Sequence, residues 1–206
     1  MLISKKFMSE QGELNKKVID WAIEVKTQLA LIDRALNVNE GGEFVDDITP
    51  QEIQAGTHAI KEYCLASKNM NLYFEYLLAI SQEDEKLNVL KEKKKHEIQT
   101  KRDKALESGL VYNEHTFQTR KEDKQNIIGA ATNLMLDMQS GTNSISEIIW
   151  IDINDEKVTF TPQDFLIFAS SVAYHTQEII FKANALKERI EQAESEQDLE
   201  AIVWEE

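Results

Sequence analysis

Residues 110–122 read LVYNEHTFQTRKE, and residues 148–164 read IIWIDINDEKVTFTPQD. Each stretch begins with β-favouring apolar residues, passes through a short polar turn and returns as a second apolar run, which predicts a β-hairpin. A Thr then precedes a segment with helical spacing, as is typical of a helix N-terminal cap. The sequence therefore predicts one small unit, a hairpin followed by a helix, that occurs twice.

The helices after the hairpins carry apolar residues at spacings of three and four. Thr119 to Glu122 predicts a capping box for the first helix, and Thr161 with Pro162 begins a long second helix. We expect the two hairpins to pair into one small sheet that both helices cover, with Trp150 in its core. The residues expected on the buried sides of the helices are Ile127, Ile128, Ala131, Leu134, Met135 and Met138 in the first, and Phe165, Phe168, Val172, His175, Ile179, Leu186 and Ile190 in the second.

The first 80 residues also have a helical pattern. Thr49 to Glu52 is a capping box with Pro50 at the first helical position, so a helix begins there. Met70 to Ile80 is apolar on almost all sides, and it is therefore either core or an aromatic contact surface. An earlier helical stripe that another surface must cover consists of Leu14, Val18, Trp21, Val25, Leu29, Ile32 and Leu36. The candidate protein-interface residues are Trp21, Tyr73, Phe74 and Tyr76.

Between these halves, Ser81 to Ser108 favours helix strongly but has few apolar residues. A helix this polar is usually exposed over much of its length, so we predict a connecting helix whose middle adds reach rather than core. The predicted fold class is α+β, with an N-terminal helical region, a long connecting helix and a C-terminal ββα-ββα unit with a small sheet and a long terminal helix. Residues 1–96 are assigned to helical attachment or oligomerisation, and residues 97–206 to the α+β domain.

Charge and composition exclude several classes of protein. A formal charge of −14 argues against a nucleic-acid partner, because binding a polyanion depends on Lys and Arg that displace phosphate counterions. A single cysteine, Cys64, cannot form an internal disulfide. The sequence lacks an apolar run long enough for a signal peptide or a membrane span. We therefore expect assembly in a cytoplasm and no membrane partner.

The sequence motifs select no catalytic or metal site. Asp152, Asn154 and Glu156 alternate as at the start of a calcium loop, but Lys157 and Gln163 stand where such a loop needs Gly and Glu. The four histidines show no pair at metal-ligand spacing, and the sequence has no Gly-rich phosphate loop or nucleophile elbow. We expect no enzyme activity, no cofactor and no metal.

Several short motifs follow one another in the second half of the chain: Arg102-Asp103, Gly109-x-x-Tyr112, Phe117-Gln118-Thr119 and Asn126-Ile127-x-Gly129-Ala130. With them, about residues 97–204 resemble an uncharacterised domain of bacteriophage tail-fibre and tail-fibre-assembly proteins. The second half of that domain is matched by Trp150, the Asn154-Asp155 turn, Val158 to Thr161, and the helix through His175, Ala185, Leu186 and Ile190.

The resemblance implies a virion or virion-assembly protein. We expect a structural component of the phage tail, at the baseplate or the tail-fibre junction, assembled in the host cytoplasm and bound to other tail proteins. Phage tails have three- and six-fold symmetry, so the resemblance also implies a homo-oligomer, with a trimer as the simplest count. A tail-fibre assembly chaperone that is absent from the mature virion is the alternative, and a host-interaction or anti-defence protein is a third.

Overall fold

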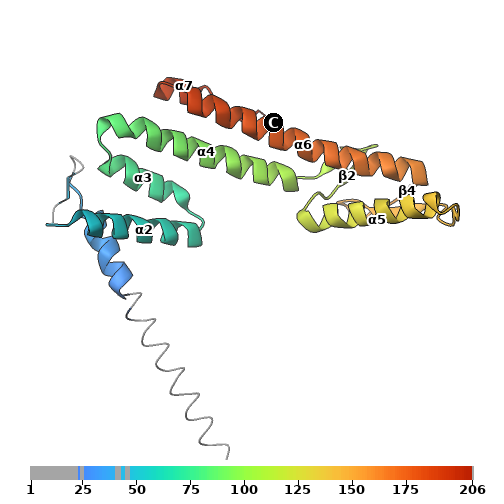
Figure 1. Cartoon of the computed structure of the whole chain (residues 1–206), viewed down its shortest axis with the longest axis horizontal. Coiled ribbons are helices and arrows are strands. Elements are labelled where there is room, and N and C mark those ends of the chain that lie inside the picture. Colours follow the sequence, from blue (N-terminus) through green and yellow to red (C-terminus); the bar gives the residue numbers. More distant parts are fainter. Residues whose placement is uncertain (1–22, 24–25, 40–42, 45–46, 206) are drawn as a thin grey trace, which may run out of the picture. The chain divides into compact units, whose positions relative to one another are not determined.

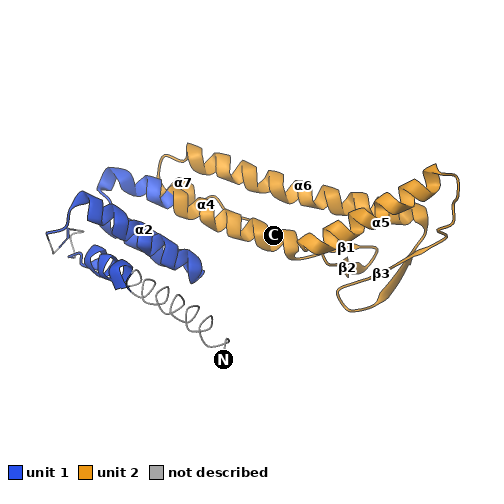
Figure 2. Ribbon diagram, turned by 60° about the horizontal axis from the view of Figure 1, so that its bottom comes forward, with its two compact units in different colours: residues 1–90 blue, residues 91–206 orange. Residues whose placement is uncertain are grey.

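The computed structural model of the chain describes residues 23, 26–39, 43–44 and 47–205, and its fold is α+β, as the sequence predicts (Figure 1). The chain divides into two compact units, Met1–Leu90 and Lys91–Glu206 (Figure 2). The division falls inside the long helix α4 (Glu83–Glu107), which also contains the predicted boundary after residue 96.

The described part of unit 1 contains helical residues 26–36, α2 (Pro50–Ala66), α3 (Met70–Ile80) and the beginning of α4. The predicted capping box of α2 is confirmed, because the Thr49 hydroxyl accepts a hydrogen bond from Glu52 N at 3.3 Å and Thr49 N donates to Glu52 Oε2 at 2.9 Å. Gly56 allows α2 to approach helix 26–36 closely, since a Cβ at that position would lie only 2.5 Å from the Cβ of Ala35.

The core of unit 1 joins the helix of residues 26–36 to α2 and α3. Its buried residues are Ala35, Ile60, Cys64 and Tyr76. Of the predicted stripe, Leu29 and Leu36 are exposed, and Ile32 packs against this core. The predicted stripe did not include Ala35, because alanine contributes little to a hydrophobic pattern. At this position, however, only a small residue fits against Gly56. The other stripe residues, Leu14, Val18, Trp21 and Val25, lie outside the described residues.

The part of α4 that belongs to unit 2 differs from the exposed connector predicted from the sequence. It runs alongside α6 (Pro162–Gln192), as both views show (Figures 1 and 2). Lys91 Nζ donates to the carbonyl of Glu191 at 2.8 Å, and Lys95 Nζ pairs with the Glu191 carboxylate at 2.5 Å. Ile98 is fully buried. The prediction that the middle of this helix adds only reach is therefore wrong, because Ile98 is buried and Lys91 and Lys95 are bound to α6.

Unit 2 contains the predicted repeat. The first copy is β1 (Leu110–Tyr112), β2 (His115–Phe117) and α5 (Lys121–Gln139). The second is β3 (Ile148–Ile151), β4 (Lys157–Phe160) and α6, after which α7 (Glu196–Glu200) follows. The prediction of one sheet is wrong, because each described hairpin forms its own two-stranded antiparallel sheet. A backbone hydrogen bond from Ile153 N to Thr116 O, at 2.8 Å, links the two hairpins, and it lies just beyond the end of β3.

An aromatic core holds the two repeats together. Phe117 and Phe160 each end the second strand of a hairpin, and their ring centroids lie 5.8 Å apart. Phe168 of α6 contacts both, with centroid distances of 4.6 Å and 5.2 Å. Trp150 is only partly buried and packs on Phe165 at 5.3 Å, so it lies at the edge of this core. The remaining buried residues of the cluster are Ile127, Ala131, Leu134 and Val172.

The buried side of α5 is narrower than predicted. Ile128, Met135 and Met138 are exposed, whereas Ile127, Ala131 and Leu134 are buried. These buried residues follow at intervals of four and three, which is one face of a helix. The sequence prediction included too many residues because nothing in the spacing says that only one side of α5 is covered.

Thr119 does not cap α5. It is 1% exposed, its hydroxyl donates to the carbonyl of Leu106 at 3.0 Å, and it accepts from Gly109 N at 3.1 Å. Both partners lie at the C-terminal end of α4, where backbone carbonyls lack helical partners. The N-terminus of α5 is instead held by Asp123, which accepts from Arg120 N at 3.0 Å. The capping box predicted from Thr119 is therefore wrong, because the end of α4 takes its hydroxyl.

Candidate functional site

Three of the four predicted interface residues, Tyr73, Phe74 and Tyr76, lie in or beside the core of unit 1. Phe74 and Tyr76 are buried, Tyr73 is partly buried, and the Tyr73 and Phe74 rings are 5.7 Å apart. The hydroxyl of Tyr76 lies 3.2 Å from that of Thr57, so its polar end is also satisfied inside the unit. Trp21 lies outside the described residues. A role for these four residues in binding a partner stays a prediction.

Unit 2 exposes large apolar side chains on several elements. On α6, Ile167, Tyr174 and Phe181 are 47%, 62% and 61% exposed and recur every seven residues. Seven residues are close to two helical turns, so the three side chains share one face of the helix. The other exposed large apolar residues described in unit 2 are Val111 on β1, Ile128, Met135, Leu136 and Met138 on α5, Ile149, Ile151 and Ile153 on or just after β3, Ile180 on α6, and Val203. None of the described helices combines the length and the apolar character that crossing a membrane requires.

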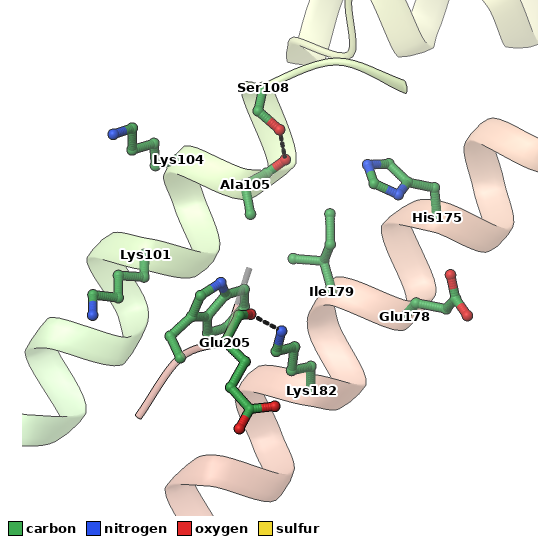
Figure 3. Close-up of a pocket in the computed structure, with 10 residues that line it drawn as sticks. Lys101, Lys104, Ala105, Ser108, His175, Glu178, Ile179, Lys182 and Glu205 are labelled. Carbon is green, nitrogen blue, oxygen red and sulfur yellow. Dashed lines mark hydrogen bonds between the residues drawn. The ribbon is translucent and has the colours of Figure 1, made fainter. Parts of the chain in front are cut away.

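A cavity of about 620 Å³ lies between α4, α6 and the end of the chain (Figure 3). Lys182 Nζ lies 4.9 Å from the ring centroid of Trp204 and donates to the carbonyl of Glu205, so the C-terminal residues form one wall. The hydroxyl of Ser108, in the same lining, donates to the Ala105 carbonyl at 2.9 Å.

His175 connects this cavity to a second one of about 450 Å³, which Leu110, Ile167 and Tyr174 also line. Figure 3 shows its ring directed from α6 toward α4. Its Nε2 atom is buried and has no hydrogen-bond partner among the described residues. Ile167 and Tyr174 of the exposed α6 stripe therefore also line the second cavity, so a partner bound there could bury both.

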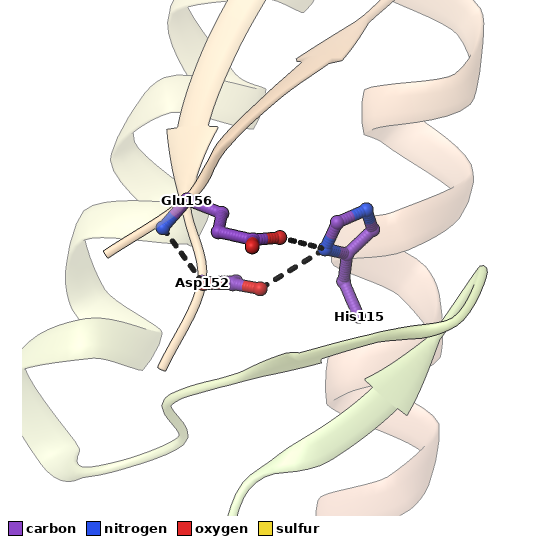
Figure 4. Close-up of side chains that lie close together, drawn as sticks. All are labelled: His115, Asp152 and Glu156. Atoms are coloured by element: carbon purple, nitrogen blue, oxygen red, sulfur yellow. Dashed lines mark hydrogen bonds and ion pairs between the residues drawn. The ribbon is translucent and has the colours of Figure 1, made fainter. Parts of the chain in front are cut away.

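A separate polar cluster lies where the two hairpins meet (Figure 4). Asp152 is 2% exposed, and its Oδ1 atom accepts from Asn154 N at 2.8 Å and from Glu156 N at 2.9 Å. Its Oδ2 atom lies 3.0 Å from Nδ1 of His115, and Glu156 Oε2 lies 3.8 Å from the same nitrogen. The hydrogen bond from His115, followed by the backbone bonds, lowers the pKa of Asp152 below its ordinary value.

The sequence placed Asp152 and Glu156 in a loop that begins like a calcium loop but lacks two of its required residues. It did not predict that His115 lies beside them. Asp152 is a turn residue here, since its carboxylate closes the loop between β3 and β4. His115 comes from the other hairpin, 37 residues earlier. A search for ligands at short sequence spacing cannot find such a pair, because the contact exists only once the hairpins are packed together.

Unit 2 is thus a small α+β domain of two hairpin–helix repeats. The chain belongs to the family described as Domain of unknown function (DUF4376), which matches residues 89–203. The match begins near the division between the units and ends in the C-terminal segment, so it coincides with unit 2. The recognition of an uncharacterised domain in this half of the chain is confirmed. Comparison with curated proteins and with solved structures finds no match.

Proposed function

We propose that the protein is a structural component of a bacteriophage tail, at the baseplate or the tail-fibre junction, and that it acts by docking rather than by catalysis. The resemblance of about residues 97–204 to a domain of tail-fibre and tail-fibre-assembly proteins supports the phage setting. The observation that carries the docking role is the α6 stripe, which consists of Ile167, Tyr174 and Phe181.

The spacing of the α6 stripe suits pairing with another helix. Paired helices interlock along a seam of apolar residues at two positions of each seven-residue repeat, and the α6 stripe supplies one of these two positions. Large contiguous apolar patches are uncommon on a lone soluble protein and usually mark an interaction site. The occupant we propose is the same helix in a second and a third copy of this chain, because equivalent helices present the same repeat and phage tails have three-fold symmetry.

Light scattering of the purified full-length chain tests self-association. We expect a trimer, and we expect Phe181→Glu to shift it toward monomer because a carboxylate would be buried in the seam. Ile128→Glu is the matched control, since Ile128 on α5 is also 61% exposed but lies on another element. A stable wild-type monomer at tens of micromolar would contradict self-association. Dissociation by Ile128→Glu alone would place the interface on α5.

The location in the virion needs a second experiment. A protein gel of purified virions should show this chain as a stoichiometric band if it is a tail component. Presence during assembly but absence from finished particles would instead support the alternative, a tail-fibre assembly chaperone. Early expression together with absence from virions would favour a host-interaction protein.

A further inference from the structure

We propose that His115, Asp152 and Glu156 bind a divalent first-row transition-metal ion, such as Zn²⁺, between the two hairpins of unit 2. This site is independent of the docking role of α6. It also departs from the sequence-based expectation of no metal, which rested on the incomplete calcium loop and on the lack of histidine pairs at ligand spacing.

The three side chains converge from two hairpins. One ligand atom from each, Nδ1 of His115 and a carboxylate oxygen from each acid, lies within 4.8 Å of the other two. Two ligands about 2.1 Å from one ion are about 3.0 Å apart at a right angle and about 3.4 Å apart at a tetrahedral angle. The observed Nδ1 distances of 3.0 Å to Asp152 and 3.8 Å to Glu156 approach these values. Glu156 is exposed, so a small side-chain rotation closes the longer gap.

The Asp152 carboxylate is held in place before any ion arrives. Two backbone N–H groups fix its Oδ1 atom, which directs Oδ2 toward His115. A buried, oriented carboxylate loses little conformational freedom when it becomes a ligand. The His115 ring is also packed, with its centroid 6.2 Å from that of Phe117. Asp152 and His115, two of the three proposed ligands, are therefore held in place by contacts within the protein.

The two carboxylates of the cluster favour a cation between them and His115. Two carboxylate oxygens face one imidazole nitrogen, and a proton on that nitrogen can point along one good hydrogen bond, the 3.0 Å contact to Asp152. Glu156, at 3.8 Å, is then beyond hydrogen-bond distance. A metal ion can contact all three atoms at once, and it would displace the Nδ1 proton to solvent when it binds.

The ligand set indicates the class of ion. Imidazole nitrogen suits Zn²⁺, Ni²⁺ and related ions, whereas Ca²⁺ and Mg²⁺ prefer ligand sets made of oxygen alone. Three protein ligands leave further coordination positions to water, as in zinc sites that are not purely structural. Because the ligands belong to both hairpins, the ion would tie His115 of β2 to the β3–β4 turn.

Titration calorimetry on full-length, chelator-treated protein tests the proposal, with ZnCl₂ as the probe and CaCl₂ as a second arm. We expect one Zn²⁺ per chain, a higher melting temperature with Zn²⁺, and neither effect with Ca²⁺. Co²⁺ should give visible absorption bands that Zn²⁺ abolishes. Failure of the wild-type protein to bind Zn²⁺ in a saturable way would overturn the site.

Two variants locate the ion. His115→Gln keeps a hydrogen-bond donor near Asp152, and Glu156→Gln keeps the backbone N–H that closes the turn, so both should fold. Each should weaken Zn²⁺ binding at least tenfold and remove the Co²⁺ bands. The matched controls, His58→Gln on α2 and Asp155→Asn in the same turn, should bind as wild type does. Equal Zn²⁺ affinity in all five proteins would mean only nonspecific binding to surface carboxylates, and it would refute the proposal.

Discussion

The two hairpin–helix repeats of unit 2 share a plan but differ in how each hairpin connects to its helix. Phe117 and Phe160 occupy the same position, the last residue of the second strand, and meet in the core. α5 begins at Lys121, the fourth residue after Phe117, whereas α6 begins at Pro162, the second residue after Phe160. The first connection is therefore two residues longer.

This difference gives the Thr of each connection a different role. Thr161 stands directly before α6 and caps it, accepting from Asp164 N at 3.2 Å. Thr119 lies one residue further from its helix and bonds to the end of α4 instead. A Thr hydroxyl forms hydrogen bonds with whichever unpaired backbone group lies close to it. A Thr before a helix therefore caps that helix in one repeat and binds the end of α4 in the other. The lesson is that a capping motif predicts a helix more reliably than it predicts the cap itself.

The turns of the two hairpins are also stabilised by different interactions. Asn113 and Glu114 both have positive φ, 48° and 68°, which is the backbone of a tight two-residue hairpin turn without glycine. The second turn is longer and is closed by the Asp152 carboxylate. The first turn is thus held by its backbone at some conformational cost, and the second by an ionisable side chain.

The largest expected effect tests whether the repeats contribute equally to the core. Phe117→Ala should lower the free energy of unfolding by about 3 to 5 kcal/mol, because a fully buried ring is lost and leaves a cavity. Trp150→Ala should cost less, since Trp150 lies at the core edge. Urea unfolding of both variants measures this. A greater loss for Trp150→Ala would show that the second hairpin, not the aromatic centre, dominates stability.

The second prediction separates the two Thr roles. Thr119→Val should destabilise by about 2 kcal/mol, because the partly buried Gly109 N–H and Leu106 carbonyl lose their shared partner. Thr161→Val should cost about 1 kcal/mol, the usual value of an exposed N-cap. Thermal and urea unfolding provide both numbers. If Thr161→Val proved the costlier change, the assignment of Thr119 to the end of α4 would lose its support.

A smaller effect of opposite sign is expected in the first turn. Glu114→Gly should stabilise the protein by up to about 1 kcal/mol, because glycine adopts positive φ without the steric cost of a side chain. Asp155→Gly, at a φ of 63° in the second turn, should gain less, since Asp tolerates this conformation better than Glu. Melting temperatures of the two variants rank them. An equal rise in melting temperature for both variants would contradict a greater conformational cost in the first turn.

The smallest effect is local and appears in acid. The pKa of Asp152 is lowered below its ordinary value of 3.8 by its bonds to His115 and the turn backbone. Its contribution to stability is therefore complete above that value and is lost as the pH falls through the lower pKa of the folded state. Amide exchange followed by NMR should show the Asn154 and Glu156 N–H groups losing protection in this range, with no matching change at Asn113. Asp152→Asn should remove this pH dependence.

Local signals in the sequence predicted much of the fold. The hairpins, the capping box of α2 and the start of α6 depend on interactions over a few residues. The helical spacing of α6 also predicted the shared face of its buried residues, which are Phe165, Phe168, Val172, Ile179, Leu186 and Ile190. The same reasoning overestimated the buried side of α5 and treated α4 as exposed. Spacing reports which residues share a face, but it does not report whether anything covers that face.

The sequence by itself determined the order and type of the elements, because caps, turns and apolar spacing act between residues close in the chain. Only the tertiary structure decided the sheet count, the partner of Thr119, the cover over Ile98, and the meeting of His115 with Asp152 across 37 residues. These features depend on which surfaces pack together. Packing is settled by the fit of the aromatic core as a whole, which no short segment encodes.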